Sequence, residues 1–246
     1  MNPAVLLFVK FACILGFLGI PGCAAWKPAA DPRLELERRI ASSPELAVLF
    51  VGNSYSFGVP REFAKQAAAR GKKVRVGHSV HGGWTLARHA ADAGTLRKIR
   101  DGKWDIVVFQ EYSAIPSRSG RRRAKAMDRP LRELVAEARR AGAVPVLYQT
   151  WGRRDGFEEM PGDDFHAMTG RVRAGYRAAA RNAGGLHVVP VGDVWEQRFS
   201  RDLYVDDGSH PSAAGNRLTA EVFVDAIFGR DELRGPNDKG EREAPL

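Results

Sequence analysis

A serine near the start of the chain and an aspartate and a histidine near its end are of the types that carry out acyl transfer. Ser54 follows an apolar run and two residues that favour turns, while Asp207 and His210 lie three residues apart. A serine hydroxyl becomes a nucleophile when a histidine takes its proton and a carboxylate orients that histidine. These three residues therefore predict a covalent, acyl-enzyme chemistry.

Two adjacent aspartates, Asp206 and Asp207, precede this histidine. The carboxylate must return to the imidazole Nδ1 while Nε2 faces Ser54. Flexible Gly208 allows a tight turn that brings Asp207 beside His210. We therefore predict that Asp207 is the orienting carboxylate and that Asp206 is dispensable.

The elements that must position these residues follow an alternating pattern. Five short apolar runs lie at 46–51, 73–76, 106–109, 144–148 and 186–191, and helical patterns at 62–70, 124–141, 165–183 and 213–228. The first, third and fourth runs are continuously apolar, which indicates burial on both faces of a parallel sheet. We predict a doubly wound, flavodoxin-like three-layer α/β/α fold with a parallel five-stranded sheet over residues 45–228.

In such a sheet, ligands bind beside the carboxyl ends of the strands, where the loops converge. Ser54 follows the first run, Gly77 and His78 the second, and Gln110 the third. A Gly-Gly-Trp turn comes shortly after the second run, and the Asp/His pair lies beyond the fifth. A nucleophile, a base, a carboxylate and donors for an oxyanion thus share one rim of the predicted sheet.

Two blocks at opposite ends of this pattern carry a family resemblance. The first is the segment Phe50-Val51-Gly52-Asn53-Ser54, and the last is Asp207-Gly208-Ser209-His210-Pro211. They resemble the Gly-Asp/Asn-Ser and Asp-x-x-His blocks of the SGNH/GDSL hydrolase superfamily. The resemblance implies that Ser54 is the nucleophile, His210 the base and Asp207 its partner.

The resemblance also implies an oxyanion hole built from the N–H of Ser54, a glycine and an amide side chain. The glycine falls on Gly82 or Gly83, and we favour Gly83 because it precedes a helical run whose N–H groups would point at the site. The family's third block is Gly-x-Asn-Asp, whereas residues 108–113 read Val-Phe-Gln-Glu-Tyr-Ser, typical of a less characterised branch. We expect Gln110 to replace the asparagine donor, and Glu111, which would repel an oxyanion, to meet a structural partner.

Three aromatic residues, Trp84, Tyr112 and Trp151, follow strand ends and are candidates to bind substrate, with ordinary packing as the alternative for each. His78, His81 and His89 fit no common metal-ligand spacing, so we expect no metal and no cofactor. For His89 we expect the role of a polar helix residue near the rim.

The chain carries 38 Lys and Arg against 29 Asp and Glu, a formal net charge of +9. Because the arginines are dispersed and no motif interleaves them with aromatic residues, we expect a solvated surface and no nucleic-acid partner. One basic cluster contains four arginines: Arg118, Arg121, Arg122 and Arg123. It predicts a solvated loop, with contact to an anionic polysaccharide or lipid headgroups as the alternative.

The N-terminus has the pattern of an export signal. Residues 5–22 are apolar apart from Lys10 and end in Gly and Pro, and Ile20-Pro21-Gly22-Cys23 resembles a bacterial lipobox. We predict a signal peptide at 1–22, lipidation of Cys23 and membrane attachment through that lipid, with ordinary cleavage near Ala24 or an uncleaved anchor as alternatives. A tether with a short helix then spans 23–44, and a charged tail spans 229–246.

Together these features predict an exported serine esterase of the periplasm or cell envelope. The predicted substrate is a short acyl ester, such as an acetyl ester, of a small molecule, a carbohydrate or another envelope component. The alternative is a non-catalytic module that keeps the fold and holds a glycan at the same rim, for which the missing third-block asparagine is the strongest argument.

Overall fold

The computed structural model describes residues 31–118 and 120–229. The predicted signal peptide, Cys23, the first part of the tether and the tail from residue 230 lie outside these residues. The described part of the tether forms helix α1 (Pro32–Ser42), where a short helix is predicted. No helix within the described ranges is long and apolar enough to cross a membrane.

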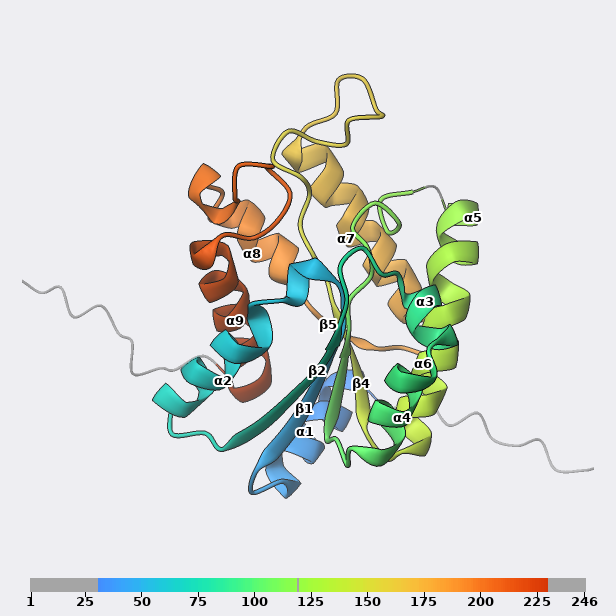
Figure 1. Ribbon diagram of the computed structural model, residues 1–246, viewed down its shortest axis with the longest axis vertical. Helices are drawn as coiled ribbons and strands as arrows, with labels where there is room; N and C mark the ends of the chain where they lie inside the picture. The colour runs from blue at the N-terminus through green and yellow to red at the C-terminus, as the bar shows by residue number, and fades with distance from the viewer. Residues whose placement is uncertain (1–30, 119, 230–246) are drawn as a thin grey trace, which may run out of the picture.

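Five parallel strands form one sheet at the centre of the molecule (Figure 1). They are β1 (Leu46–Gly52), β2 (Val74–Val80), β3 (Ile106–Phe109), β4 (Val144–Tyr148) and β5 (His187–Val189). Their order is β2-β1-β3-β4-β5, and every pairing is parallel. This is the flavodoxin-like order, so the predicted fold class is confirmed.

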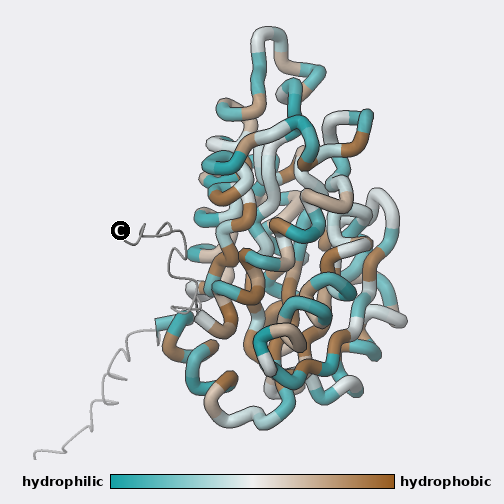
Figure 2. The backbone as a smooth tube through the Cα atoms, turned by 90° about the vertical axis from the view of Figure 1, so that its left-hand side faces the viewer, coloured by the Kyte–Doolittle hydropathy of each residue, from teal (hydrophilic) through white to brown (hydrophobic). Residues whose placement is uncertain are grey.

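Helices cover both faces of the sheet (Figure 1). One face carries α1, α2 (Val59–Ala69), α8 (Val191–Gln197) and α9 (Ala213–Phe228). The other carries α3 (Leu86–Ala91), α4 (Ala93–Asp101), α6 (Arg129–Arg140) and α7 (Phe165–Asn182). The loop between β4 and α7 projects beyond the rest of the molecule (Figure 2).

Strand β1 explains why its apolar run is unbroken. Val48 and Phe50 belong to the core beneath α2 and α9, whereas Leu49 and Val51 belong to the core beneath α3, α4 and α6. All seven residues of β1 are buried, because the strand lies between β2 and β3 and has helices above and below. The end of this central strand is therefore a rigid support for whatever follows it.

Strand β2 is longer than predicted, and two residues that were predicted to lie at the rim are part of the strand. It pairs with β1 through Val80, so Gly77 and His78 lie within the strand and not in a loop beside the site. The backbone at Gly77 lies against the Trp104 ring, where an added Cβ would be only 2.3 Å from a ring carbon. As an edge strand, β2 is partly exposed and contains polar residues, and this concealed its length in the sequence.

The basic segment is helical from Gly120 onward. Helix α5 (Gly120–Arg123) continues through a π-helical turn, η2 (Ala124–Asp128), into α6. Arg123 is buried and pairs with Asp128, with Nη1 2.8 Å from Oδ1. The segment from Gly120 is therefore a helix and not the predicted loop, whereas Arg118, Arg121 and Arg122 are exposed to solvent, as predicted.

Candidate active site

Ser54 begins a short 3₁₀ turn, η1 (Ser54–Ser56), directly after the central strand. Asn53 caps this turn, because its Oδ1 accepts a hydrogen bond from the Tyr55 N–H at 3.2 Å. The half-buried Ser54 places its Oγ 2.8 Å from His210 Nε2. The structure thus brings together two predicted residues from opposite ends of the domain.

Asp207 completes a line of hydrogen bonds through His210. Its Oδ2 lies 2.6 Å from His210 Nδ1, and its Oδ1 accepts from the N–H groups of Ser209 and His210. Partial burial raises the pKa of Asp207, but these hydrogen bonds together outweigh burial and lower the pKa below its usual value. An ionised Asp207 keeps the proton on Nδ1, which leaves Nε2 free to accept the Ser54 proton.

The turn that carries His210, residues 207–210, is held by hydrogen bonds from side chains and backbone groups of neighbouring segments. The Tyr55 hydroxyl lies 2.6 Å from Ser209 Oγ, and the Trp151 indole N–H donates to the Ser209 carbonyl at 3.2 Å. The backbone N–H of Arg154 donates to the Gly208 carbonyl at 2.7 Å. Gly208 has a φ of +64°, a conformation that favours glycine. The loop after β4 therefore fixes the position of His210, the predicted base.

Gln110 does not take the predicted place of an oxyanion donor. Its Oε1 accepts from the Asn53 N–H at 2.8 Å and from the Ser56 hydroxyl at 3.0 Å. Its Nε2 donates to Asn53 Oδ1 at 3.0 Å and to the Glu111 carbonyl at 2.7 Å. The side chain is fully buried and both amide hydrogens are already donated, so the prediction is wrong. Gln110 instead ties the serine turn to the end of β3.

Glu111 meets structural partners, as expected. Its buried carboxyl group accepts hydrogen bonds from the N–H groups of Leu86, at the start of α3, and Tyr112. Burial raises its pKa to about 8, and these two bonds offset only part of that rise. The group is therefore mainly protonated at neutral pH, and it joins the end of β3 to α3.

His89 is a second buried titratable group beneath the site. Burial lowers its pKa to about 4, so the ring is neutral at neutral pH. Its Nε2 lies 2.9 Å from the Gly52 carbonyl, which can only accept, and its Nδ1 lies 3.1 Å from the Thr95 hydroxyl. His89 therefore donates through Nε2 and supports the last residue of β1, which is a structural role on a helix near the rim, as predicted.

Comparison with known proteins identifies the family. No protein-family model matches the chain, and neither does any curated protein. A solved structure from Slackia heliotrinireducens, assigned to the SGNH hydrolases, is 31% identical with a TM-score of 0.63, and the match covers 74% of this chain and 99% of that one. The chain belongs to the SGNH hydrolases. As a member of that family, it is a serine hydrolase that acts on ester bonds.

Two further solved structures share the fold of this SGNH hydrolase. A DUF4886 family protein from Bacteroides uniformis is 20% identical with a TM-score of 0.64, covering 76% of this chain and 84% of its own. An acetylxylan esterase from Geobacillus stearothermophilus is 19% identical with a TM-score of 0.55, covering 74% and 94%. Proteins with different names thus share one scaffold.

Two backbone N–H groups are available near Ser54, the predicted nucleophile of this SGNH hydrolase. Among the described residues, neither the N–H of Ser54 nor that of Gly83 has an acceptor. Gly83 has a φ of +68° and open space where a side chain would lie. The turn that carries it is tied to the serine turn, because Asn53 Nδ2 donates to the Trp84 carbonyl at 3.0 Å.

The three aromatic candidates have different environments. Trp151 is fully buried and stacks on Trp195 at 3.6 Å, so the prediction that it contacts substrate is wrong. The partly exposed Trp84 stacks on His81 with a ring separation of 4.0 Å. The half-buried Tyr112 has its hydroxyl 3.4 Å from Arg153 Nη2.

Two residues that hold the histidine turn, Tyr55 and Arg154, were not singled out in the sequence, whereas Trp151 was predicted to have a different role. Tyr55 directly follows the nucleophile and Arg154 lies three residues beyond Trp151, so adjacency to candidate residues was the available signal. Their contacts join loops far apart in the chain, which spacing alone does not reveal.

The described residues contain no cluster of three or more His, Cys, Asp or Glu side chains able to hold a metal ion.

Proposed function

We propose that this SGNH hydrolase cleaves short acyl esters through an acyl-enzyme on Ser54, with His210 as general base and Asp207 as its orienting partner. The observation that carries the proposal is the continuous line of hydrogen bonds, 2.8 Å from Ser54 Oγ to His210 Nε2 and 2.6 Å from Nδ1 to Asp207 Oδ2. This is the arrangement that activates a serine hydroxyl.

In the first half of the reaction, His210 Nε2 takes the hydroxyl proton while Ser54 Oγ attacks the acyl carbon. The resulting imidazolium, stabilised by Asp207, gives that proton to the leaving alcohol as the bond to the acyl carbon breaks. In the second half, His210 takes a proton from water, whose oxygen attacks the acyl-enzyme. The acid leaves and Ser54 regains its proton.

The negative charge that develops on the acyl oxygen needs donors that are already in place. We assign this role to the N–H groups of Ser54 and Gly83, which have no acceptor among the described residues. The buried network of Gln110 and Asn53 holds the serine turn and the glycine turn together, so these donors need no rearrangement during the reaction. Gln110 therefore acts behind the donors and does not touch the substrate.

The substrate that we propose is a short acyl ester, such as an acetyl ester, on a carbohydrate or another cell-envelope component. The Asp207 and His210 side chains are 47% and 43% exposed, so a bulky alcohol can approach the nucleophile from solvent. Trp84 and Tyr112 are the aromatic candidates that would contact it. The structural likeness to an acetylxylan esterase supports this substrate class.

We further propose that the protein is exported and lipidated at Cys23, because Ile20-Pro21-Gly22-Cys23 closes an apolar leader. Acyl chains would move the mature protein into the detergent phase on phase separation. A Cys23→Ser variant should remain in the aqueous phase after its leader is cleaved. A variant that keeps its leader and still partitions with membranes would instead indicate an uncleaved anchor.

Hydrolysis assays on acetylated sugars, longer lipid esters and aryl acetates test the activity. We expect turnover of the acetyl esters, with kcat reduced about 10³-fold or more in Ser54→Ala. Equal turnover by the wild type and the variant would overturn the serine mechanism. Preference for long-chain lipid esters would overturn the proposed substrate class while leaving the mechanism intact.

A further inference from the structure

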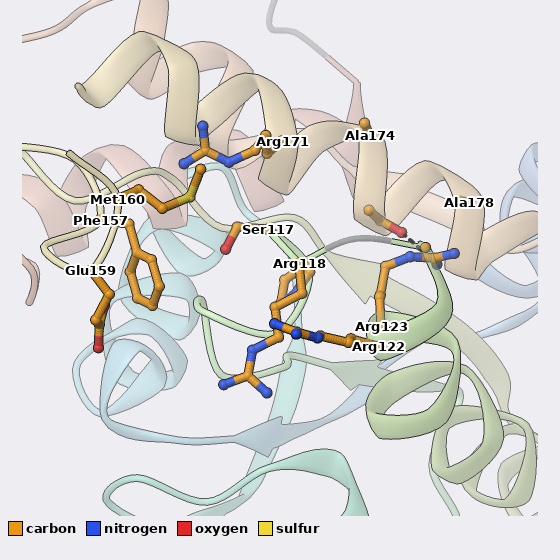
Figure 3. A pocket seen from close by; sticks show the side chains of 13 residues that line it. Ser117, Arg118, Arg122, Arg123, Phe157, Glu159, Met160, Arg171, Ala174 and Ala178 are labelled. Carbon is orange, nitrogen blue, oxygen red and sulfur yellow. Dashed lines mark hydrogen bonds between the residues drawn. The ribbon is translucent and has the colours of Figure 1, made fainter. Parts of the chain in front are cut away.

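A basic pocket lies at the same end of the molecule as the proposed active site but is formed by other residues. It has a volume of about 1070 Å³ and lies between the β3–α5 loop, α5, the β4–α7 loop and α7 (Figure 3). Four arginines line it: Arg118, Arg122, Arg123 and Arg171. None of the three proposed catalytic residues lines this pocket.

Two of these arginines have carboxylate partners. Arg123 pairs with Asp128 and also donates to the Gly175 carbonyl, at 2.8 Å and 3.2 Å. Arg171 makes a bidentate pair with Asp163 through its two terminal nitrogens. Its Nε atom is buried and has no hydrogen-bond partner. These pairs fix two guanidinium groups in the pocket wall.

The other two arginines carry the unbalanced charge. Arg118 and Arg122 are exposed and extend into the pocket, and neither forms an ion pair with the described residues (Figure 3). Glu159, on the opposite loop, is the acidic residue among those that line the pocket. With Asp128 and Asp163 neutralising two arginines, the positive charges still outnumber the negative ones.

The pocket also has an apolar wall. Phe157 and Met160 come from the β4–α7 loop, and Ala174 and Ala178 come from α7 (Figure 3). Met160 is 44% exposed, so its side chain is accessible to a ligand in the pocket. A ligand that fits must therefore combine negative charge with a weakly polar face, such as a sugar ring.

One loop connects this pocket to the proposed active site. Near its start, the Arg154 N–H donates to the Gly208 carbonyl of the histidine turn. The residue just before it, Arg153, has its guanidinium 5.3 Å from the centre of the Phe157 ring, and its Nη2 lies 3.4 Å from the Tyr112 hydroxyl. Among the described residues Arg153 has no carboxylate partner, so positive charge extends from the pocket toward the active-site rim.

We propose that this pocket binds an anionic group on the alcohol part of the ester substrate, specifically the carboxylate of an acidic glycan. Arg118 and Arg122 bind the carboxylate of the glycan, because paired guanidinium groups suit its geometry. Phe157 and Met160 contact the sugar ring. The inference rests on the proposed esterase function, which it extends by naming the substrate class. A phosphate group on a glycan would present the same chemistry.

The test compares Arg118→Gln/Arg122→Gln with a matched control, Arg121→Gln/Arg132→Gln. The control removes the same charge from exposed arginines nearby that do not line the pocket. Binding of an oligogalacturonate to each protein is measured by calorimetry, with a xylo-oligosaccharide as the neutral probe and inorganic phosphate as a third. We expect the oligogalacturonate to bind the wild type at least tenfold more tightly than the neutral probe, and the pocket variant to lose about that factor.

The binding measurements decide the proposal. An affinity loss in the pocket variant and not in the control supports it, whereas tighter binding of inorganic phosphate than of oligogalacturonate overturns the carboxylate and assigns a phosphate group in its place. Equal affinity for the acidic and neutral probes, or equal losses in both variants, overturns it. Parallel assays with acetylated forms of both oligosaccharides separate the two claims. Absence of hydrolysis with selective binding contradicts the esterase function alone, whereas hydrolysis with equal kcat/KM contradicts the pocket alone.

Discussion

The proposed catalytic line consists of Ser54, His210 and Asp207, and the buried network beneath it consists of Gln110, Glu111 and His89. The two groups use similar side chains in opposite surroundings. His210 and Asp207 are more than two-fifths exposed and form one line of hydrogen bonds that ends on Ser54. Gln110, Glu111 and His89, by contrast, are fully buried, and backbone groups or neighbouring side chains occupy their polar atoms. The difference teaches that residue type does not separate a reactive group from a supporting one. The exposure of the side chain to solvent does.

The largest expected effect breaks the exposed line at its carboxylate. Asp207→Asn keeps the shape of the turn but favours the wrong imidazole tautomer and removes the charge that stabilises the imidazolium. We expect kcat to fall by up to about 10⁴-fold, and Asp206→Asn to change it little. Steady-state kinetics on an aryl acetate compare the two variants. A larger loss from Asp206→Asn, with both proteins folded, would contradict the assignment.

A change in the buried network should alter the pH dependence of the free energy of unfolding more than it alters kcat. Because burial raises the folded-state pKa of Glu111 from 4.5 to about 8, folding takes up a proton between these values. Its contribution to stability is therefore complete below pH 4.5 and is lost as pH rises toward 8, a change of up to about 5 kcal/mol. Glu111→Gln should flatten this part of the stability curve, as measured by urea unfolding across pH. An unchanged slope in the variant would mean that Glu111 is not the group responsible.

Gln110 tests the boundary between support and catalysis. Gln110→Ala leaves the buried N–H of Asn53 and the buried hydroxyl of Ser56 without an acceptor, and we expect a loss of about 2–4 kcal/mol in the free energy of unfolding. Below the melting temperature, KM should change little. A variant that keeps full stability but loses 10²-fold or more in kcat would instead identify Gln110 as a direct oxyanion donor.

The smallest expected effect concerns the support of the histidine turn. Trp151→Phe removes the N–H that donates to the Ser209 carbonyl but keeps an aromatic ring between Tyr55 and Trp195. We expect a loss of about 1 kcal/mol in stability and a fall of only a few-fold in kcat. Thermal unfolding and kinetics measure the two effects. A loss in kcat as large as that of Asp207→Asn would place Trp151 in the catalytic line itself.

The fold and the catalytic line were accessible from the sequence because both leave local patterns. Unbroken apolar runs predicted the buried parallel strands, and the spacing of Asp207 and His210 matched a turn in which both groups meet. The limits of β3, β4 and α9 agree with the predicted ranges.

The roles of Gln110 and Trp151 were not accessible in this way. Both follow strand ends, where side chains often face a ligand, yet both are buried by contacts with segments far along the chain. Gln110 is bound to the serine turn, and Trp151 stacks on Trp195 of α8. Such contacts depend on how the loops fold over one another, which strand patterns do not encode. The glycan-binding alternative rested on the missing third-block asparagine, and buried Gln110 occupies that place as a support.

The central claim is that the exposed line makes Ser54 the nucleophile. A fluorophosphonate probe, which reacts with activated serines, tests it most directly when the modified peptide is identified by mass spectrometry. We predict one modification, on Ser54, with labelling strongly slowed in His210→Ala because the variant has no base to take the hydroxyl proton. Modification of another serine, or equal labelling of Ser54 without His210, would contradict the account.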